Sequence, residues 1–248
     1  MNLTGKVAFV TGGSRGIGSA ISKKLASLGA NVFLTFNERQ MEAEKVVREI
    51  KDLNGNAIFA KMNVCKRLEV SVAMEKCKDS FDGIDILVNN AGINMPTDFD
   101  KILDNDWDEI MATNLKGPFI CSQLAIKFMK ERRGGSIINI GSVSGQYGGP
   151  RTAHYAASKA GLISLSQVIA RFGASENIRC NTISAGLIET DMAKKGLSSP
   201  IVKDAAKNII LKRFGTPNEI ADVVAFLASD GSSYITAQTL NVNGGLYF

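Results

Sequence analysis

The sequence has few of the residues that build metal sites. Its 248 residues include a single histidine, His154, and four cysteines. The cysteines are widely spaced, with no Cys-x-x-Cys pair and no neighbouring histidine: Cys65, Cys77, Cys121 and Cys180. A zinc centre gathers cysteine and histidine ligands at short, regular spacings. We therefore expect no metal site and four reduced thiols in or near the core.

Long apolar runs and dense charge blocks are also missing. The N-terminus has only four successive apolar residues, Val7 to Val10, which is too short for a signal-peptide core, and no later run approaches a membrane span. The net charge of +5 is spread along the chain, without the Lys/Arg blocks of nucleic-acid binders. These absences predict a cytoplasmic protein, and the mild positive charge suits anionic ligands such as nucleotides.

Short apolar runs alternate with amphipathic segments along the whole chain. The apolar runs "VAFV" and "DILVNN" are apolar on both faces, as in strands of a parallel sheet covered by two helix layers. We expect an α/β fold in one domain, 1–248, with a doubly wound, mainly parallel seven-stranded sheet and helices on both faces. The expected strands are Val7–Thr11, Asn31–Thr35, Ala57–Met62, Ile84–Asn89, Ser136–Ile140, Ile178–Ile183 and Thr239–Val242.

Helical periodicity fills the intervals between these strands. In 17–28, for example, Ile17, Ile21, Leu25 and Leu28 fall on one face, and Gly29 supplies the stop. The other expected helices are 39–53, 115–132, 155–174 and 217–227. The irregular stretch 186–200 and the helical pattern that follows it predict a mobile lid over the substrate at about 187–211.

A glycine-rich turn, "TGGSRGIG", joins the first expected strand to the first expected helix. Its glycines, Gly12, Gly16 and Gly18, let the backbone approach a pyrophosphate closely, and the helix N-terminus favours its negative charge. The spacing G-x3-G-x-G differs from the commoner G-x-G-x-x-G, but its place between a strand and a helix predicts a dinucleotide site. Within the turn, we expect Ser14, Arg15 and Ile17 to contact the dinucleotide as well.

The end of the second expected strand bears on which nicotinamide nucleotide is bound. An acidic residue there would bond the adenosine ribose and repel a 2′-phosphate. The sequence instead has the neutral Asn37, and Arg15 in the glycine turn could pair with a phosphate. NADP(H) is therefore favoured over NAD(H), although Glu38 could reach the ribose and keeps NAD(H) open.

Five further motifs, together with the glycine turn, resemble the short-chain dehydrogenase/reductase family over essentially the whole chain. They are "NNAG" at 89–92, "TNLKG" at 113–117, "IGSVSG" at 140–145, "YAASK" at 155–159 and "NVNGG" at 241–245. The resemblance implies a Rossmann-like oxidoreductase with a catalytic tetrad of Asn114, Ser142, Tyr155 and Lys159. Ser142 would hold the substrate oxygen, Asn114 would anchor a proton-supplying water chain, and Lys159 would bind the nicotinamide ribose.

The resemblance also implies the remaining contacts of the cofactor. The adenosine side would be lined by Asn90, Ala91 and Gly92, the adenine ring would lie between Asn63 and Val64, and the nicotinamide end would touch Ile188 and Thr190. One departure lies just before that last segment, where the family usually has Pro-Gly and this chain has Ala185-Gly186.

The four-residue spacing of Tyr155 and Lys159 has its own chemical consequence. On a helix, this spacing places both side chains on one face. At about 4 Å and an effective dielectric of about 20, the ammonium would attract a phenolate by roughly 4 kcal/mol. That attraction predicts a tyrosine pKa lowered from about 10 toward 7, suited to exchanging a proton with a carbonyl or an alcohol. His154 is expected to be a structural or rim residue.

Within the family, the chain is similar to the 3-oxoacyl-[acyl-carrier-protein] reductases of fatty-acid synthesis. The similarity lies in "GLIETDM" at 186–192, "FLASD" at 226–230, "SSYITAQTLNVNGG" at 232–245 and the final "GLYF". It implies NADPH-dependent reduction of a 3-oxoacyl thioester. Basic residues at a helix end could attract an acidic acyl carrier protein, or could simply be solvated: Lys127, Lys130, Arg132, Arg133 and Arg171.

Other functions stay open at this stage. After "NNAGI" the reductases tend to continue Thr-Arg-Asp, whereas this chain reads "NMPTDFDKI", so a sugar, a polyol or another secondary alcohol oxidised with NAD(P) is an alternative substrate. A non-catalytic dinucleotide-binding scaffold is a third possibility, but it would not need Tyr155 and Lys159 together. The resemblance further implies a homotetramer packed through the helices at 115–132 and 155–174 and through the C-terminal strand, with "GLYF" buried there or on its own subunit.

Overall fold

A computed structural model of the chain describes residues 1–190, 204 and 206–248. Seven strands of these described residues form one sheet in the order β3-β2-β1-β4-β5-β6-β7, and every neighbouring pair is parallel. This confirms the predicted doubly wound α/β fold. The strands are β1 (Val7–Val10), β2 (Asn31–Phe36), β3 (Asn56–Lys61), β4 (Ile86–Asn89), β5 (Gly135–Ile140), β6 (Ile178–Ala185) and β7 (Thr239–Val242).

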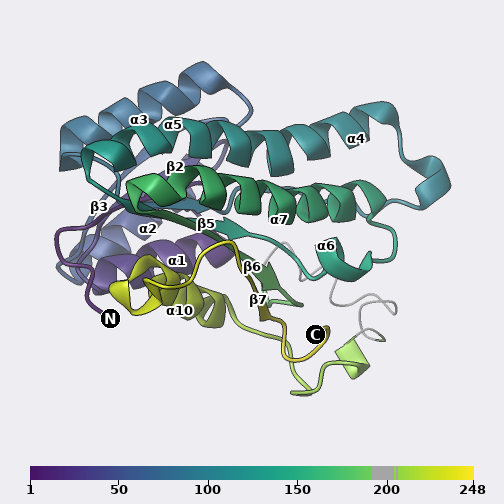
Figure 1. Ribbon diagram of the computed structural model, residues 1–248. Helices are drawn as coiled ribbons and strands as arrows, with labels where there is room; N and C mark the ends of the chain where they lie inside the picture. The colour runs from purple at the N-terminus through teal and green to yellow at the C-terminus, as the bar shows by residue number, and fades with distance from the viewer. Residues whose placement is uncertain (191–203, 205) are drawn as a thin grey trace.

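Helices cover both faces of the sheet (Figure 1). Helices α1, α2 and α10 lie on one side, and α3, α5 and α7 lie on the other. Strand β1 shows why two layers are needed, because Ala8 and Val10 belong to one apolar cluster while Val7 and Phe9 belong to the other. The α-helices with complete bounds among the described residues are α1 (Gly16–Ser27), α2 (Gln40–Asp52), α3 (Arg67–Phe81), α4 (Asp104–Met111), α5 (Gly117–Glu131), α6 (Ser144–Tyr147), α7 (Ala153–Gly173) and α10 (Pro217–Ala228).

Two longer helices and several short ones were not expected from the sequence. Helix α3 has buried residues at helical spacing, Val70, Ala73, Met74 and Cys77, so its periodicity was present but overlooked. Helix α4 leads into five residues of π-helix, Ala112–Lys116, which join it to α5. Three short 3₁₀ helices cover Phe99–Lys101, Ala174–Glu176 and Asp230–Ser232.

The cysteines are free, as expected, and three of them are buried. Burial raises the pKa of the thiols of Cys121 and Cys180 to about 12 and raises that of Cys77 further. Cys65 is only partly buried. Thiols that are held in the protonated form in this way are poor nucleophiles and poor metal ligands, so the three buried cysteines contribute packing.

Most of the predicted lid lies outside the described residues, since 191–203 and 205 are not described. The described segments before and after these residues are joined by two backbone hydrogen bonds. The amide of Gly215 donates to the carbonyl of Leu187 at 3.0 Å, and the amide of Glu189 donates to the carbonyl of Gly215 at 2.9 Å. None of the described helices is long and apolar enough to cross a membrane.

Candidate active site

The glycine-rich turn leaves β1 and enters α1 at the carboxyl edge of the sheet. Two of its glycines, Gly12 and Gly16, have positive φ angles of 63° and 52°, which side chains rarely adopt. A side chain on Gly18 would also collide, because its Cβ would lie 2.2 Å from the carbonyl oxygen of Gly12. The turn therefore needs glycine at all three positions.

The next loop along the sheet edge is bonded directly to this turn. The side-chain oxygen of Thr11 accepts hydrogen bonds from the backbone amides of Asn90 and Ala91, both at 3.0 Å. The amide group of Asn90 donates to the carbonyls of Thr11 and Gly12, at 3.0 and 2.9 Å. Asn90 thus shapes the turn. Thr11, which the sequence reasoning left out of the site, joins the two loops; its place at the end of β1 is the signal that could have shown this.

The geometry of the turn fits the pyrophosphate of a dinucleotide. Arg15 is the N-cap residue of α1, and its side chain forms no capping hydrogen bond. The leading amides of a helix then point toward solvent, with the positive end of the helix dipole behind them. Of the other residues predicted at this turn, Ser14 is buried and Ile17 is partly buried within the first turn of α1. A closely approaching anion would find amide donors and no side chain in the way.

The side chains that follow β2, where the sequence predicts the adenosine ribose, are exposed. Asn37, Glu38 and Arg39 are all exposed, and Arg39 forms an ion pair with Glu42 at 3.0 Å. Arg15 is exposed too and has no ion pair among the described residues. Of the two arginines at this end of the site, Arg15 therefore has its charge available for an anion.

The predicted adenine contacts lie after β3. The side-chain oxygen of Asn63 accepts from the backbone amide of Cys65 at 2.9 Å, and the backbone amide of Asn63 donates to the carboxylate of Glu69 at 2.8 Å. Val64 is buried against the start of α5, where a Cβ on Gly117 would lie 2.8 Å from it. The loop that carries both residues is therefore held from two sides.

Asn114 lies in the π-helical segment between α4 and α5, where the ordinary helical bonds are interrupted. Its fully buried side chain accepts from the backbone amide of Ile93 and donates to the carbonyl of the same residue, both at 2.9 Å. It also donates to the hydroxyl of Ser158 at 3.2 Å. Asn114 thus joins the loop after β4 to α7, and a Cβ on Gly92 would lie 3.2 Å from its side-chain oxygen.

Ser142 and Tyr155 approach each other from separate elements. Ser142 follows β5, and its hydroxyl accepts from the backbone amide of Ser144 at 3.2 Å. Tyr155 lies in the first turn of α7, and its phenol forms a hydrogen bond with Ser142. The serine and tyrosine oxygens therefore face one point at the carboxyl edge of the sheet, where a carbonyl oxygen could meet both.

The prediction that Lys159 lowers the pKa of Tyr155 is wrong. The ammonium nitrogen of Lys159 lies 5.7 Å from the centre of the Tyr155 ring and donates to the carbonyl of Ile140 at 2.7 Å. Burial raises the pKa of Tyr155, and the hydrogen bond with Ser142 opposes this only in part. Burial also lowers the pKa of Lys159, to about 8. Removal from water thus outweighs attraction between the two groups.

His154 is completely buried, which fits the structural role that we expected and not a place at the rim. Its Nδ1 accepts from the backbone amide of Tyr155 at 3.0 Å. This bond satisfies one of the first amides of α7, because the N-cap residue Thr152 donates its hydroxyl to Gly149 instead. His154 therefore stabilises the turn that carries Tyr155.

The residues predicted for the nicotinamide end, Ile188 and Thr190, follow β6. Ile188 is buried and forms an isolated β-bridge with Gly215. Thr190 lies near the glycine turn, since a Cβ on Gly16 would be 3.6 Å from its methyl group. Gly186, which follows alanine here, packs so closely that its Cβ would lie 2.6 Å from the Cα of Asn243. Close packing at Gly186 fixes this segment without the proline.

The site therefore combines a glycine-rich turn at the start of α1 with a hydroxyl pair and an ammonium group. An ammonium group can hold ribose hydroxyls, and a phenol bonded to a serine can give a proton to a carbonyl oxygen. Among the described residues no cluster of histidine, cysteine or carboxylate side chains could hold a metal ion.

Comparison with known proteins gives the same picture over nearly the full length. Residues 12–247 match the family described as enoyl-(acyl carrier protein) reductase. A 3-oxoacyl-[acyl-carrier-protein] reductase of Staphylococcus epidermidis is 42% identical over 242 residues, covering 98% of this chain and 99% of the relative. The protein of the same name from Thermotoga maritima is 40% identical over 246 residues, covering 99% of both chains.

Solved structures share the fold closely. The crystal structure of gox2181 has a TM-score of 0.95 and 32% identity, and the alignment covers 99% of this chain and 96% of that one. A structure from Sinorhizobium meliloti, described as a short-chain alcohol dehydrogenase, has a TM-score of 0.91 and 32% identity, covering 99% and 97%. With its fold, its motifs and these full-length relatives, the chain belongs to the short-chain dehydrogenase/reductase family and is an oxidoreductase.

Proposed function

We propose that this chain reduces a 3-oxoacyl thioester to the 3-hydroxyacyl thioester with NADPH. The observation that carries the proposal is the 40–42% identity, over nearly whole chains, to relatives named for that reaction. The paired oxygens of Ser142 and Tyr155 supply the chemistry that ketone reduction needs.

Each tetrad residue has a part in the proposed reduction. Ser142 donates a hydrogen bond to the ketone oxygen, and Tyr155 gives that oxygen its proton. Lys159 binds the ribose hydroxyls, while Asn114 keeps the loop after β4 in place through its two bonds to Ile93. A bound nicotinamide nucleotide supplies the hydride to the carbonyl carbon.

The protonation states favour the reductive direction at neutral pH. A raised pKa keeps the Tyr155 phenol protonated, which is the form that donates to a developing alkoxide. Lys159, with a pKa near 8, is largely charged at pH 7 and becomes neutral above pH 8. We therefore expect reduction of the ketone to weaken as the pH rises through about 8, once the ammonium loses its proton.

NADPH is proposed over NADH because Asn37 is neutral and Arg15 has no ion pair with any residue that the structure describes. A guanidinium can hold a phosphate through two parallel hydrogen bonds. Replacing Arg15 with alanine should raise the KM for NADPH at least tenfold, about 1.4 kcal/mol, and leave the KM for NADH within twofold. Equal changes for both nucleotides would assign Arg15 a structural role, and a native preference for NADH would make Glu38 the ribose ligand.

An acyl carrier protein is the proposed carrier of the substrate, but the predicted basic docking surface is smaller than expected. Lys130 pairs with Glu176 at 2.8 Å, and Arg132 pairs with the buried Asp85 at 3.2 Å. Lys127, Arg133 and Arg171 are exposed and have no ion pair within the part of the chain that the structure describes.

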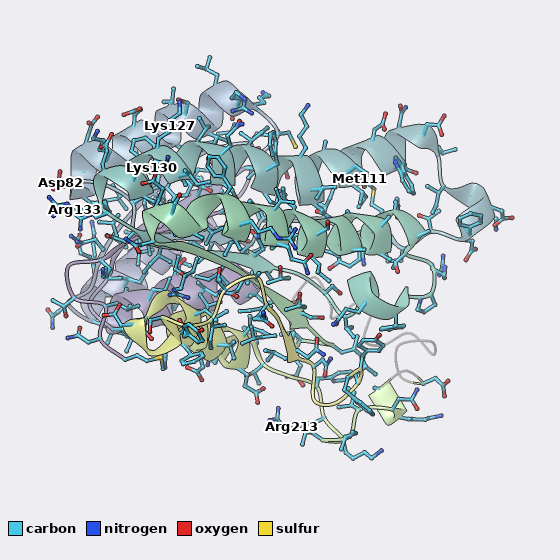
Figure 2. All side chains as sticks on the ribbon, in the orientation of Figure 1. Asp82, Met111, Lys127, Lys130, Arg133 and Arg213 are labelled. Atoms are coloured by element: carbon cyan, nitrogen blue, oxygen red, sulfur yellow. The ribbon has the colours of Figure 1, made fainter. Side chains whose placement is uncertain are left out.

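The position of this surface also limits its role. Figure 2 shows Lys127, Lys130 and Arg133 together at one end of α5, and the segment with Asn114 joins the other end. Fifteen helical residues separate the two ends by about 22 Å. A carrier protein bound there would present its substrate from that distance. Charge reversal at Lys127 and Arg133 should raise the KM for acyl carrier protein substrates and leave that for a small thioester unchanged.

The exposed face of α5 and α7 supports the proposed homotetramer. A groove between these helices and the π-helical segment is lined by Met111, Leu115, Phe119 and Leu165. Farther along α7, Phe172 is 62% exposed. Apolar faces of this kind are usually covered by a partner, and we propose a second copy of the chain. Light scattering of a Phe172→Asp variant should show smaller assemblies than the wild type.

The end of the chain does not need a partner to pack, since Tyr247 stacks on Tyr147 of the same subunit with ring centres 5.9 Å apart.

The deciding experiment follows the absorbance of the reduced nucleotide with acetoacetyl thioester, comparing NADPH with NADH. Rapid NADPH oxidation that a Tyr155→Phe variant abolishes is the expected result. Inactivity on thioesters, with NAD reduced by a sugar, a polyol or another secondary alcohol, would establish the alternative instead. The altered loop after Ile93 and the similarity to a protein described as an alcohol dehydrogenase favour that alternative. The cytoplasmic location stays a prediction.

A further inference from the structure

Loop 93–98, which contains the start of the stretch 94–102 that departs from the related reductases, is held at both of its ends. At the first end, the amide and carbonyl of Ile93 are bonded to the side chain of Asn114, both at 2.9 Å. Gly92, one residue earlier, approaches Lys159, because a Cβ there would lie 3.7 Å from its ammonium nitrogen. The segment therefore begins at the tetrad itself.

At the other end, the loop is joined to the segment that leads into α7. Arg151 Nε lies 2.8 Å from a carboxylate oxygen of Asp98, and the backbone amide of Thr97 donates to the carbonyl of Arg151, also at 2.8 Å. Lys101 lies 3.6 Å from the second oxygen of Asp98. We name the paired contacts of Arg151 with Thr97 and Asp98 the clasp.

The backbone of Arg151 has an unusual conformation. Its φ is 56°, in the left-handed region, where a residue with a Cβ is less stable than glycine. The sequence nevertheless has arginine here, directly after a proline and directly before the N-cap residue of α7. The left-handed turn brings the Arg151 carbonyl to Thr97, while the side chain reaches Asp98.

The clasp lies close to the catalytic tyrosine along the chain. Arg151 precedes Tyr155 by four residues and leads into the first turn of α7. Figure 1 shows the connection from β4 to α4 and the connection from α6 to α7 meeting at the end of the molecule where α7 begins. The six residues 93–98 thus run from the contact with Asn114 to the contact with Arg151, which lies four residues before Tyr155.

We propose that Asp98 and Arg151 are positioning residues that set the shape of the substrate cleft by fixing loop 93–98. The inference rests on the proposed function only for the identity of the substrate. A loop fixed at both ends presents one wall to the ketone, and release of one end lets that wall move. Loss of the clasp then weakens substrate binding without changing the groups that react.

The size of the effect follows from the exposure of the pair. The side chains of Arg151 and Asp98 are 48% and 45% exposed, so water and salt weaken their attraction. An exposed ion pair of this kind changes an equilibrium constant, such as the one between the fixed and the released loop, by a factor of about two to five. We expect Asp98→Asn and Arg151→Gln each to raise the KM for acetoacetyl thioester about two- to fivefold, with kcat and the KM for NADPH unchanged.

A double-mutant cycle tests the clasp directly. The double variant should resemble either single variant, because the contact can be lost only once. Lys78→Gln is the matched control, since it removes another exposed pair, Lys78 with Glu131 at 2.7 Å, from a different part of the surface. High salt should raise the KM of the wild type toward that of the variants. Additive effects, or an equal change in the control, would overturn the proposal.

Hydrogen exchange gives a second measurement that does not need turnover. The Thr97 amide should exchange about two to five times faster in both single variants than in the wild type, because its acceptor on Arg151 is no longer held in place. Unchanged exchange would refute the clasp even if the ketoreductase function holds. Faster exchange in a protein inactive on thioesters would keep the clasp and refute the proposed substrate.

Discussion

Replacing Lys159 with methionine should make the protein inactive and change how its stability depends on pH. The side chain is 5% exposed, and burial lowers the pKa of its ammonium to about 8. The usual value is 10.5, so the folded protein holds this charge at a cost of about 3 kcal/mol relative to the unfolded chain. Methionine keeps a flexible stem of similar length and removes the charge.

Removing the buried charge should therefore stabilise the variant, but the loss of one hydrogen bond opposes this stabilisation. The ammonium donates to the carbonyl of Ile140 at 2.7 Å, and a hydrogen bond from a charged donor contributes about 1.5–3 kcal/mol. At pH 7 the two effects partly cancel, and the net gain of the variant is at most about 2 kcal/mol. The pH dependence separates them, because only the charge titrates.

The sign of that dependence follows from proton binding. Between pH 8 and 10.5 the unfolded chain keeps a proton on Lys159 that the folded protein has lost, so wild-type stability rises with pH. From pH 7 to 9 the rise is about 1.3 kcal/mol, and the variant lacks it. The advantage of the variant should therefore shrink by that amount over the same interval.

Urea unfolding at pH 7 and pH 9, at one protein concentration, measures this difference. Lys127→Met serves as the control, because it makes the same substitution at an exposed lysine. If the difference in unfolding free energy between Lys159→Met and the wild type were the same at both pH values, the ammonium would not be desolvated and the reasoning would be refuted.

Two further predictions concern the glycine turn and α10. Gly18→Ala should weaken NADPH binding at least tenfold, about 1.4 kcal/mol, because its Cβ would lie 2.2 Å from the backbone oxygen of Gly12; Gly231→Ala, whose Cβ meets its nearest atom at 3.4 Å, should bind normally in the same titration. The hydrogen bonds of Arg213 lower the pKa of Glu219 to about 2, so stability from this contact is complete above about pH 4.5 and is lost as the pH falls toward 2. Glu219→Gln should accordingly lower the Tm at pH 7 and have little effect at pH 2; an equal loss at both values would contradict the assignment.

The sheet and most helices could be predicted because their signals are local. All seven strands lie within two residues of their expected ends, since each is a short apolar run bounded by turn residues. Helices α3 and α4 were missed for different reasons. The periodicity of α3 was overlooked, whereas α4 carries only one buried residue, Ile110, and offers little pattern to detect.

The residues of the proposed tetrad could be named from the sequence, but their electrostatics could not. Helical spacing correctly places Tyr155 and Lys159 in one helix, yet it says nothing about how much water surrounds them. That depends on β5, whose Ile140 carbonyl takes the lysine hydrogen bond, and on the loop that brings Ser142 to the tyrosine. The predicted lowering of the tyrosine pKa is wrong because burial raises this pKa, and the spacing of two residues in the sequence does not show how deeply they are buried.

The sequence by itself determined the succession of the strands and of most helices along the chain, the glycine turn and the residue types of the proposed tetrad. These features depend on neighbours a few positions apart, where backbone sterics and helical or strand periodicity decide the outcome. Only the tertiary structure decided that Asn114 bonds to Ile93, that Arg132 pairs with Asp85 and that Arg151 closes on Asp98. Each of these contacts joins segments at least twenty residues apart, and both burial and charge pairing arise only when the sheet brings such segments together.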